Sequence, residues 1–407
     1  MDLNETPRSN RIHIALLGRR NTGKSSIINA LTCQEISIVS SVKGTTTDPV
    51  YKAMELLPLG PVVFIDTAGL DDDSELGGLR IQKTYDVLNK TDVALLVCDD
   101  TGVGPFEEAI LEQIKAKSIP AILLLNKTDL VKDVSETIKN YQATYKIKAI
   151  PVSAKTGMGI NDLKLQLAKS LPDDDDRFKI VSDLLSPLDI AVLVVPIDNA
   201  APKGRLILPQ QQTIRDILEA GAVSVVVKED ALKETLNSLG KKPRMVITDS
   251  QAFAKVSADI PRDIPLTSFS ILFARYKGDL ETLVDGAKSV DSLKDGDNVL
   301  IAEGCTHHRQ SDDIGTTKIP RWIRQYTGKD LNFEFSSGIK YPKDLSKYAL
   351  IVHCGGCMLN RREMLYRLNV AKENGVPIVN YGVIIAFMQG ILKRSVELFP
   401  SVSSRLY

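Results

Sequence analysis

The chain has 407 residues, of which 43% are apolar and 25% charged, so it can form two or three domains with sizeable cores. Its 51 basic residues are balanced by 51 acidic ones, which argues against a broad nucleic-acid-binding surface. No apolar run of about 18 residues occurs, and the polar N-terminus does not resemble a signal peptide. We therefore expect a cytoplasmic protein that uses its five cysteines for purposes other than a disulfide framework.

A phosphate-binding loop follows the first predicted strand. Residues 11–17 are apolar, residues 18–26 have the spacing Gly-x4-Gly-Lys-Ser, and an apolar helical segment comes next. Backbone amides of such a loop surround the β-phosphate. We expect Lys24 to contact the β- and γ-phosphate oxygens and Ser25 to bind Mg²⁺. The adjacent residues expected to contact the nucleotide are Asn21, Thr22, Gly23 and Ser26.

Three further motifs lie at the carboxyl ends of predicted strands: DTAG (66–69), NKTD (126–129) and SAK (153–155). The first offers a carboxylate for Mg²⁺ and an amide for the γ-phosphate. The second offers a carboxylate that can accept hydrogen bonds from N1–H and the N2 amine of guanine, and the third can close over the base. Because open α/β sheets bind ligands at this edge, the four motifs together predict a GTP site. The residues that we expect there are Asp66, Gly69, Asn126, Lys127, Asp129, Ser153, Ala154 and Lys155.

These motifs resemble the translation-factor-type GTPases, particularly the Era/MnmE-like branch. The stretch SSVKGTTTDPV (40–50) is similar to the first switch of that branch, which makes Thr46 the second hydroxyl on Mg²⁺. Asn21 matches a P-loop asparagine that helps to bind K⁺ in potassium-activated members. By this resemblance the catalytic residues are Lys24, Asn21, Thr46 and Gly69.

The residue that activates water is not evident. Position 70 is leucine, where Ras-like enzymes have glutamine, so the resemblance implies K⁺ in place of an arginine finger. Glu75 could orient the water. However, acidic residues crowd this loop, and a solvated switch is the favoured interpretation.

An acidic stretch at residues 171–179 predicts a linker, so we expect the GTPase domain to occupy residues 1–175. Residues 185–280 alternate between apolar strands and helices, which predicts a small α/β domain with a mostly parallel sheet. The apolar strand at 189–198 could pair across a two-fold axis and make this a dimerisation domain. An ordinary buried strand is an equally good interpretation.

Soft metal ligands gather in the third expected α/β domain, residues 285–407. One predicted strand (298–304) runs into CTHH (305–308), and another (348–353) ends at a histidine and runs into CGGC (354–357). The two strand ends would bring Cys305, His307, His353, Cys354 and Cys357 to one sheet edge. Cys33, Cys98 and His13 lie in or beside apolar stretches of the first domain, and we expect them to be packing residues.

The ligand types alone leave the metal open. A Cys-x2-Cys pair is commonly a structural zinc site, and this set could supply Cys3His. However, the two halves are separated by 44 residues rather than forming a compact knuckle. Backbone amides at Gly355 and Gly356 could donate to sulfides, so an iron–sulfur cluster with three thiolates and a labile fourth position also fits. Thiol redox chemistry is a third interpretation.

The spacing Cys-x-His, then His-Cys-x2-Cys, downstream of a GTPase domain closely resembles the HydF family, the GTPases that mature [FeFe]-hydrogenase. So do the stretches VVPIDNAAPKGRLILPQQQTIRDI and EGCTHHRQSDDIGTTKIPRWI. The resemblance implies that Cys305, Cys354 and Cys357 bind a [4Fe–4S] cluster. His353 is the first candidate for its exchangeable fourth position and His307 the second, with a carboxylate or water as alternatives. His308 has no motif to support it.

The family implies a scaffold and carrier. Two radical-SAM maturases build a di-iron subcluster precursor, and the GTPase holds it near its own cluster and delivers it to the apo-[FeFe]-hydrogenase. Slow GTP hydrolysis, completed by K⁺ or a partner, would switch partner contacts. We expect a homodimer without nucleic-acid or membrane partners. The rival interpretation is a zinc-containing ribosome- or RNA-associated GTPase, which the balanced charge disfavours.

Overall fold

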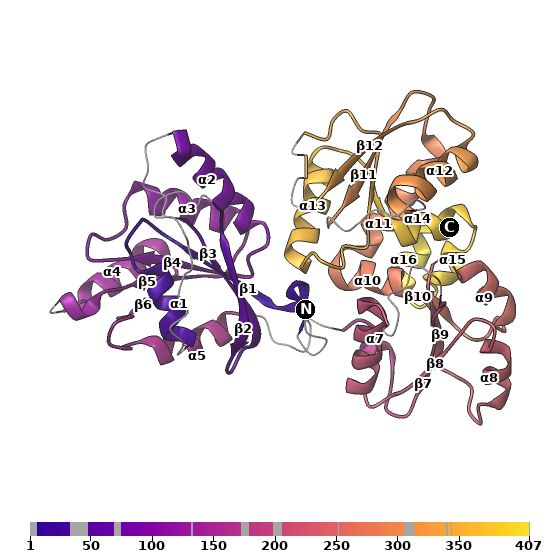
Figure 1. Ribbon diagram of the computed structural model, residues 1–407, viewed down its shortest axis with the longest axis horizontal. Helices are drawn as coiled ribbons and strands as arrows, with labels where there is room; N and C mark the ends of the chain where they lie inside the picture. The colour runs from indigo at the N-terminus through magenta and orange to yellow at the C-terminus, as the bar shows by residue number, and fades with distance from the viewer. Residues whose placement is uncertain are drawn as a thin grey trace. The chain divides into compact units, whose positions relative to one another are not determined.

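The computed structural model describes residues 6–32, 48–68, 75–131, 133–171, 179–197, 206–250, 252–304, 313–338, 341–342 and 344–406, without the side chains of residues 75–80. The chain divides into two compact units, Met1–Asp173 and Asp174–Tyr407. Each unit is an α/β structure (Figure 1). Among the described residues, no helix combines the length and the apolar composition that spanning a bilayer requires.

The first unit is built on a six-stranded sheet of order β2-β3-β1-β4-β5-β6, in which only β2 is antiparallel to its neighbour. Its strands are β1 (Ile12–Leu17), β2 (Val50–Leu56), β3 (Gly60–Asp66), β4 (Val93–Cys98), β5 (Ala121–Leu125) and β6 (Lys148–Pro151). Its helices are α1 (Lys24–Thr32), α2 (Glu75–Leu88), α3 (Pro105–Ala116), α4 (Ser135–Tyr145), α5 (Ile160–Ser170) and the short η1 (Arg8–Asn10) and η2 (Thr128–Leu130).

The central strands of this sheet are continuous apolar runs because helices cover both faces. Ile14 and Leu16 pack with α1 and α5 on one face. Ala15 and Leu17 point the other way and pack with α2 and α3. Because both faces of the sheet are covered, polar loops can gather at the carboxyl ends of its strands.

The second unit contains two parallel four-stranded sheets, of order β10-β9-β7-β8 and β12-β11-β13-β14. Its strands are β7 (Ile190–Val194), β8 (Val223–Val227), β9 (Met245–Thr248), β10 (Leu266–Ser268), β11 (Asn298–Glu303), β12 (Asn332–Ser337), β13 (Leu350–His353) and β14 (Ile378–Asn380). Its longer helices are α7 (Leu208–Glu219), α8 (Leu232–Ser238), α9 (Phe253–Asp259), α10 (Phe269–Lys277), α11 (Leu280–Lys288), α12 (Ile319–Thr327), α13 (Arg361–Glu373) and α14 (Tyr381–Met388). Short helical segments are η3 (Ser182–Leu184), η4 (Ser289–Ser292), η5 (Ile314–Lys318), α15 (Leu392–Ser395), α16 (Pro400–Ser403) and η6 (Ser404–Leu406).

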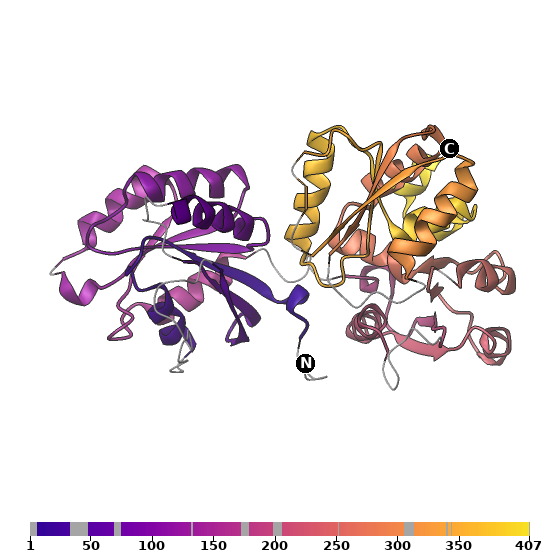
Figure 2. The same ribbon diagram turned by 45° about the horizontal axis from the view of Figure 1, so that its top comes forward.

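Helices α10, α11 and α14 lie between these two sheets (Figures 1 and 2) and join them into one hydrophobic core. The contact between α11 and β14 is especially close, because a Cβ on Gly286 would lie 2.0 Å from the carbonyl oxygen of Ile378. The regions predicted as a second and a third domain therefore share a core and belong to one compact unit.

The strand suggested to pair across a two-fold axis has no free edge. β7 lies between β8 and β9 and is parallel to both, so the suggestion is wrong for β7, and the alternative of a buried strand is confirmed. Of these two neighbours, it is β8 that lies outermost in the order of the described strands, and its residues Val223 and Val226 are exposed.

Candidate functional site

The P-loop connects β1 to α1 and holds two glycines at positions where no other residue fits without strain. Gly18 has φ +143°, and a Cβ there would lie 2.2 Å from the carbonyl oxygen of Val97. Gly23 has φ +90°, and a Cβ would lie 2.3 Å from Nδ2 of Asn126. Between them Asn21 adopts the left-handed region at φ 62°, which asparagine tolerates better than most residues. The loop thus brings its backbone close to the neighbouring strand ends.

Lys24 and Ser25 begin α1 at the mouth of this loop. The ammonium of Lys24 is buried and donates to the carbonyl oxygens of Gly18 at 2.8 Å and Arg19 at 2.6 Å. The hydroxyl of Ser25 donates to Oδ2 of Asp66 at 2.5 Å. A hydroxyl and a carboxylate are thus in contact at the point where the sequence predicts Mg²⁺.

Asn126 connects three of the four motifs. Its Nδ2 donates to the carbonyl oxygen of Thr22 at 2.8 Å, and its Oδ1 accepts from the amide of Ala154 at 3.1 Å. The hydroxyl of Thr22 in turn donates to the carbonyl oxygen of Arg19. One buried amide side chain therefore fixes the P-loop relative to the two loops expected to contact the base.

Asp129 is the residue expected to recognise guanine, and Ser153 orients it by donating from its hydroxyl to Oδ1 at 2.7 Å. This hydrogen bond lowers the pKa of the Asp129 carboxyl group, which favours the ionised form. Beside it, Lys127 adopts φ 62° and its ammonium donates to Asp99 at 3.0 Å. The carboxylate remains at the surface, open to a ligand.

A hollow of about 700 Å³ lies over these motifs. Its lining comes from the P-loop, from α1 and from the loops after β5 and β6: Asn21, Gly23, Ser26, Asn29, Ala30, Asn126, Lys127, Asp129, Leu130, Ala154 and Lys155. The structure therefore brings residues of the P-loop together with residues of two motifs that begin at positions 126 and 153.

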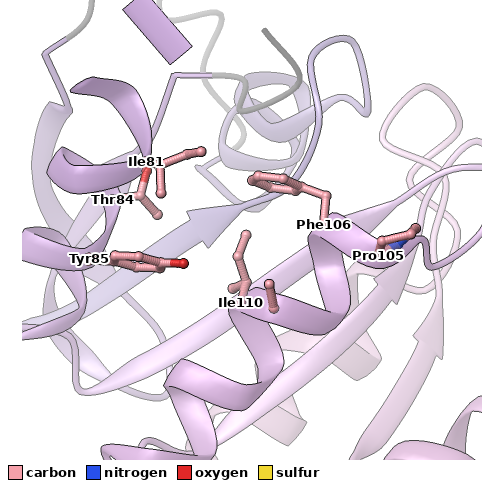
Figure 3. A pocket seen from close by; sticks show the side chains of 7 residues that line it. Ile81, Thr84, Tyr85, Pro105, Phe106 and Ile110 are labelled. Carbon is pink, nitrogen blue, oxygen red and sulfur yellow. The ribbon is translucent and has the colours of Figure 1, made fainter. Parts of the chain in front are cut away.

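A second, smaller hollow of about 360 Å³ lies between α2 and α3 and has a different character. Figure 3 shows Ile81, Thr84 and Tyr85 of one helix facing Phe106 and Ile110 of the other. The lining is apolar except for two hydroxyl groups, so it does not suit a phosphate.

In the second unit, Cys354 follows β13 and lies beside the end of β11. Its Sγ accepts from the amides of Gly304 at 3.0 Å and Gly356 at 3.4 Å. Burial raises the pKa of the Cys354 thiol, whereas the two amide donors oppose that rise. Amides that point at a sulfur atom stabilise the thiolate that a metal requires.

A buried lysine holds the loop that carries Cys354 and Cys357. Lys277, the last residue of α10, donates to the carbonyl oxygens of Gly356 and Cys357 at 3.0 Å and Leu359 at 2.9 Å. Burial lowers the pKa of Lys277 to about 8, although the nearby cysteines oppose the shift. Nothing in the sequence near residue 277 signals this role.

Both ring nitrogens of His353 already have partners. Nδ1 donates to the carbonyl oxygen of Cys354 at 2.7 Å, and Nε2 accepts from Arg367 at 3.1 Å. Burial, reinforced by the charge of Arg367, lowers the pKa of His353 to about 3, so the ring is neutral. Arg367 is itself paired with Glu363. This geometry does not favour the expected role of His353 as an iron ligand.

Several predicted residues lie outside the described part of the chain: Cys33, Thr46, Gly69, Leu70, Cys305, His307 and His308, as well as the side chain of Glu75. Their roles stay predictions. Within the described residues no three His, Cys, Asp or Glu side chains form a metal-sized group. Cys98 and His13 are buried in the first unit, as expected for packing residues.

The two units match different known proteins. Residues 13–127 match the family model described as "50S ribosome-binding GTPase". Among curated proteins, GTPase Der of Nitratiruptor sp. is 36% identical over 174 residues, 40% of this chain and 37% of that protein. GTPase Era of Halothermothrix orenii is 30% identical over 187 residues, 44% of this chain and 63% of that protein. A crystal structure of Aquifex aeolicus Era bound to GDP and AlF4⁻ aligns at 20% identity over 56% of this chain and 98% of that chain, with a TM-score of 0.35.

The chain thus spans between about a third and two thirds of the length of these curated relatives. The four motifs, the hollow over three of them and the family match define the first unit as a P-loop GTPase domain.

The matches of the second unit show to which family the chain belongs. Residues 180–278 match the hydrogen maturase F dimerization domain, and residues 281–398 match the hydrogen maturase F tetramerization domain. These two matches together span more than half of the chain. The chain belongs to the hydrogen maturase F (HydF) family.

Proposed function

We propose that the chain is a GTP-hydrolysing carrier in [FeFe]-hydrogenase maturation. It binds a [4Fe–4S] cluster through Cys305, Cys354 and Cys357, holds a di-iron precursor made by two radical-SAM maturases, and delivers it to the apo-hydrogenase. The observation that carries the proposal is a cysteine sulfur surrounded by backbone amides in a HydF-family chain that also has a GTPase domain.

In the GTPase domain, Lys24 leaves its two loop carbonyls and binds the β- and γ-phosphates. Ser25 and Thr46 bind Mg²⁺, and Asp66, which already contacts Ser25, holds the metal through water. The amide of Gly69 meets the γ-phosphate. Asn21 contributes to a K⁺ site that completes charge stabilisation, so we expect hydrolysis to be slow without this ion. These interactions order the switch loops while the γ-phosphate is present.

Base recognition follows from the geometry of the other two loops. Asp129 accepts from guanine, and Ser153 keeps its carboxylate ionised and oriented. The backbone at Ala154 and the side chain of Lys155 close over the base. Asn126 holds these loops against the P-loop, so base and phosphate binding are linked through one side chain.

The residues at the end of β13 fit an iron–sulfur cluster. Cys305 directly follows Gly304 in the sequence, and the amide of Gly304 donates to Cys354 Sγ. Cys357 lies three residues after Cys354. Both other cysteines are therefore near Cys354, either along the chain or through Gly304. A cluster held there supplies an iron with an exchangeable ligand position. Iron ligation by His353 would require its ring to give up one of two hydrogen bonds. The fourth position therefore falls to His307, a carboxylate or water.

The edge of β8 is the surface through which we expect two copies to pair. The amide of Val223 donates to the carbonyl oxygen of Asp189, and the carbonyl oxygen of Val227 accepts from the amide of Val195, at the two ends of β7. The alternate residues Ser224 and Val226 therefore direct their backbone groups outward. The hydroxyl of Ser224 is buried and has no partner among the described residues. The match to a dimerization domain over residues 180–278 supports a second copy as the occupant. The zinc-containing ribosome-associated alternative has no supporting observation in the described residues.

The test is activation of the apo-hydrogenase. The full chain, loaded anaerobically in the presence of the two radical-SAM maturases, is mixed with apo-[FeFe]-hydrogenase, and hydrogen evolution is measured. We expect activation by the wild type, none by Cys357→Ser, and wild-type activation by Cys98→Ser, which changes a buried thiol of the first unit. Activation by Cys357→Ser at the wild-type level would contradict the proposal.

A further inference from the structure

Lys277 is a buried cation whose three donor hydrogens are all used by one loop. Only 2% of the residue is exposed, and its ammonium donates to three carbonyl oxygens between residues 356 and 359. An ammonium group has three donors and no acceptor, so this coordination is complete. The lysine therefore fixes the shape of the segment that carries Cys354 and Cys357.

The ammonium of Lys277 forms no ion pair with a carboxylate of the described residues, and its hydrogen bonds there go to neutral carbonyl groups. Burying an ammonium group is costly unless a negative group offsets it. Cys354 and Cys357 of the same loop can supply negative charge when they are ionised, and their thiolates would interact favourably with the lysine. A buried positive charge is thus placed beside a site for anionic sulfur.

The contact also connects two parts of the second unit. Lys277 ends α10, within the segment that matches the dimerization domain, whereas the cysteine loop belongs to the segment that matches the tetramerization domain. A second cation makes the reciprocal connection, because Arg361, at the start of α13, donates to the carbonyl oxygen of Tyr276. The C-terminal end of α10 and the cysteine loop therefore hold each other in place.

We propose that Lys277 is a positioning residue for the iron–sulfur site: it holds the Cys354–Cys357 loop in its ligating shape and offsets the negative charge of the thiolate-bound cluster. The inference rests on the proposed function, in which these cysteines hold a [4Fe–4S] cluster. Three thiolates give such a cluster a net negative charge, and net charge is one of the factors that set its reduction potential. Removing the nearby cation makes reduction, which adds negative charge, less favourable.

The experiment compares three variants of the full chain. Lys277→Met keeps the stem length but removes the charge and the donors, and Lys277→Arg keeps the charge. The matched control is Arg394→Met, because Arg394 is also a cation that donates to backbone carbonyls, here those of Ser257, Ile260 and Pro261. In the described part of the chain, none of these hydrogen bonds goes to the cysteine loop. Two properties are measured: amide hydrogen exchange of residues 355–359 in the metal-free protein, and the cluster midpoint potential by an EPR-monitored titration.

We expect Lys277→Met to exchange these amides at least tenfold faster and to reduce the equilibrium constant for one-electron reduction at least tenfold. The latter is a shift of about 59 mV to more negative potential. Lys277→Arg should restore most of the potential, and Arg394→Met should change neither property. If Lys277 had only a structural role, Lys277→Met would speed up amide exchange, but the midpoint potential would not depend on the charge of residue 277.

An unchanged potential in Lys277→Met would overturn the charge role, and unchanged exchange would overturn the positioning role. If Lys277→Met retains too little cluster for a titration, the neutral Lys277→Gln takes its place in the comparison with Lys277→Arg. Failure of the proposed function has a separate signature, because the wild type itself would then contain no iron and sulfide. That result would also overturn the proposal that Lys277 offsets the charge of a cluster. The exchange measurement would still test whether Lys277 holds the Cys354–Cys357 loop.

Discussion

We expect guanine selectivity to depend on the carboxylate of Asp129. It lies open in the hollow over the GTPase motifs and is held by Ser153. Replacing it by asparagine exchanges an acceptor for a donor toward guanine. We expect Asp129→Asn to weaken GTP binding by roughly 100-fold or more, because a polar mismatch in such a site is strongly rejected. Xanthosine nucleotides, which present a carbonyl there, should bind better than they do to the wild type.

The measurement is titration with fluorescent guanosine and xanthosine nucleotides. Asp133→Asn serves as the control, because Asp133 is exposed and instead accepts from the amide of Ser135 at the start of α4. Equal GTP affinity of the wild type and Asp129→Asn would show that the base is recognised elsewhere.

His13, buried in β1, makes the first unit sensitive to acid. Burial lowers its pKa from 6.5 to about 4, against a smaller opposing effect of its hydrogen bond to Arg11. Between pH 6.5 and 4 the unfolded chain therefore binds a proton that the folded chain does not. Stability falls as the pH falls through this window, by on the order of 3 kcal/mol in total, and is fully retained above pH 6.5.

We expect His13→Gln, which keeps a side-chain donor but does not titrate, to flatten this dependence. Urea unfolding of the full chain at several pH values can be followed by labelling the buried Cys98 with a pyridyl disulfide and identifying the peptide by mass spectrometry. The same slope with pH in both proteins would rule out His13 as the cause.

At the scale of elements, the two glycines of the cysteine loop have different roles. Gly356 has φ +61°, and a Cβ there would lie 2.3 Å from the terminal methyl of Met364. Gly355 has no left-handed φ and no described atom within 4 Å of its added Cβ. We expect Gly356→Ala to destabilise the second unit by about 1–2 kcal/mol and Gly355→Ala to change stability by less than about 0.5 kcal/mol.

Urea unfolding followed by the fluorescence of the single tryptophan, Trp322 in α12, measures this difference. Equal effects of the two substitutions would mean that the loop does not depend on the left-handed conformation of Gly356.

The free edge of β8 provides a second test at this scale. Val226→Pro removes an outward N–H without breaking a described hydrogen bond to β7. If two copies pair along this edge, one hydrogen bond per copy is lost, and the dimer dissociation constant should rise at least about tenfold. Val226→Thr keeps the N–H and should dimerise like the wild type. Sedimentation equilibrium distinguishes these outcomes, and an unchanged Val226→Pro dimer would place the interface elsewhere.

Much of the GTP site could be predicted from the sequence because its requirements are local. Gly18 and Gly23 are needed by the backbone conformation of one short loop, and a strand and a helix flank that loop in the sequence. The link through Asn126 was less evident, since it depends on strands that meet only in the folded sheet.

The remaining features depend on long-range contacts that leave no local pattern. β7 and β8 are both apolar strands, and only the order of strands shows which one has a free edge. The sequence around His353 is typical of a metal ligand, and its contact with Arg367, on the following helix, leaves no signal in that sequence. Lys277 is 79 residues from the nearest carbonyl that it binds, and a lysine at a helix end is usually solvated.

At the scale of the whole molecule, we propose that one chain combines a GTPase domain with a distinct unit that binds an iron–sulfur cluster. The two are distinct compact units, so loading of the cysteines should not require nucleotide. The most direct test is analysis of iron, acid-labile sulfide and zinc in the anaerobically reconstituted full chain and in Cys354→Ser. We expect about four iron and four sulfide per chain, both lost in Cys354→Ser. Stoichiometric zinc without sulfide would show that the cysteines hold zinc and no iron–sulfur cluster.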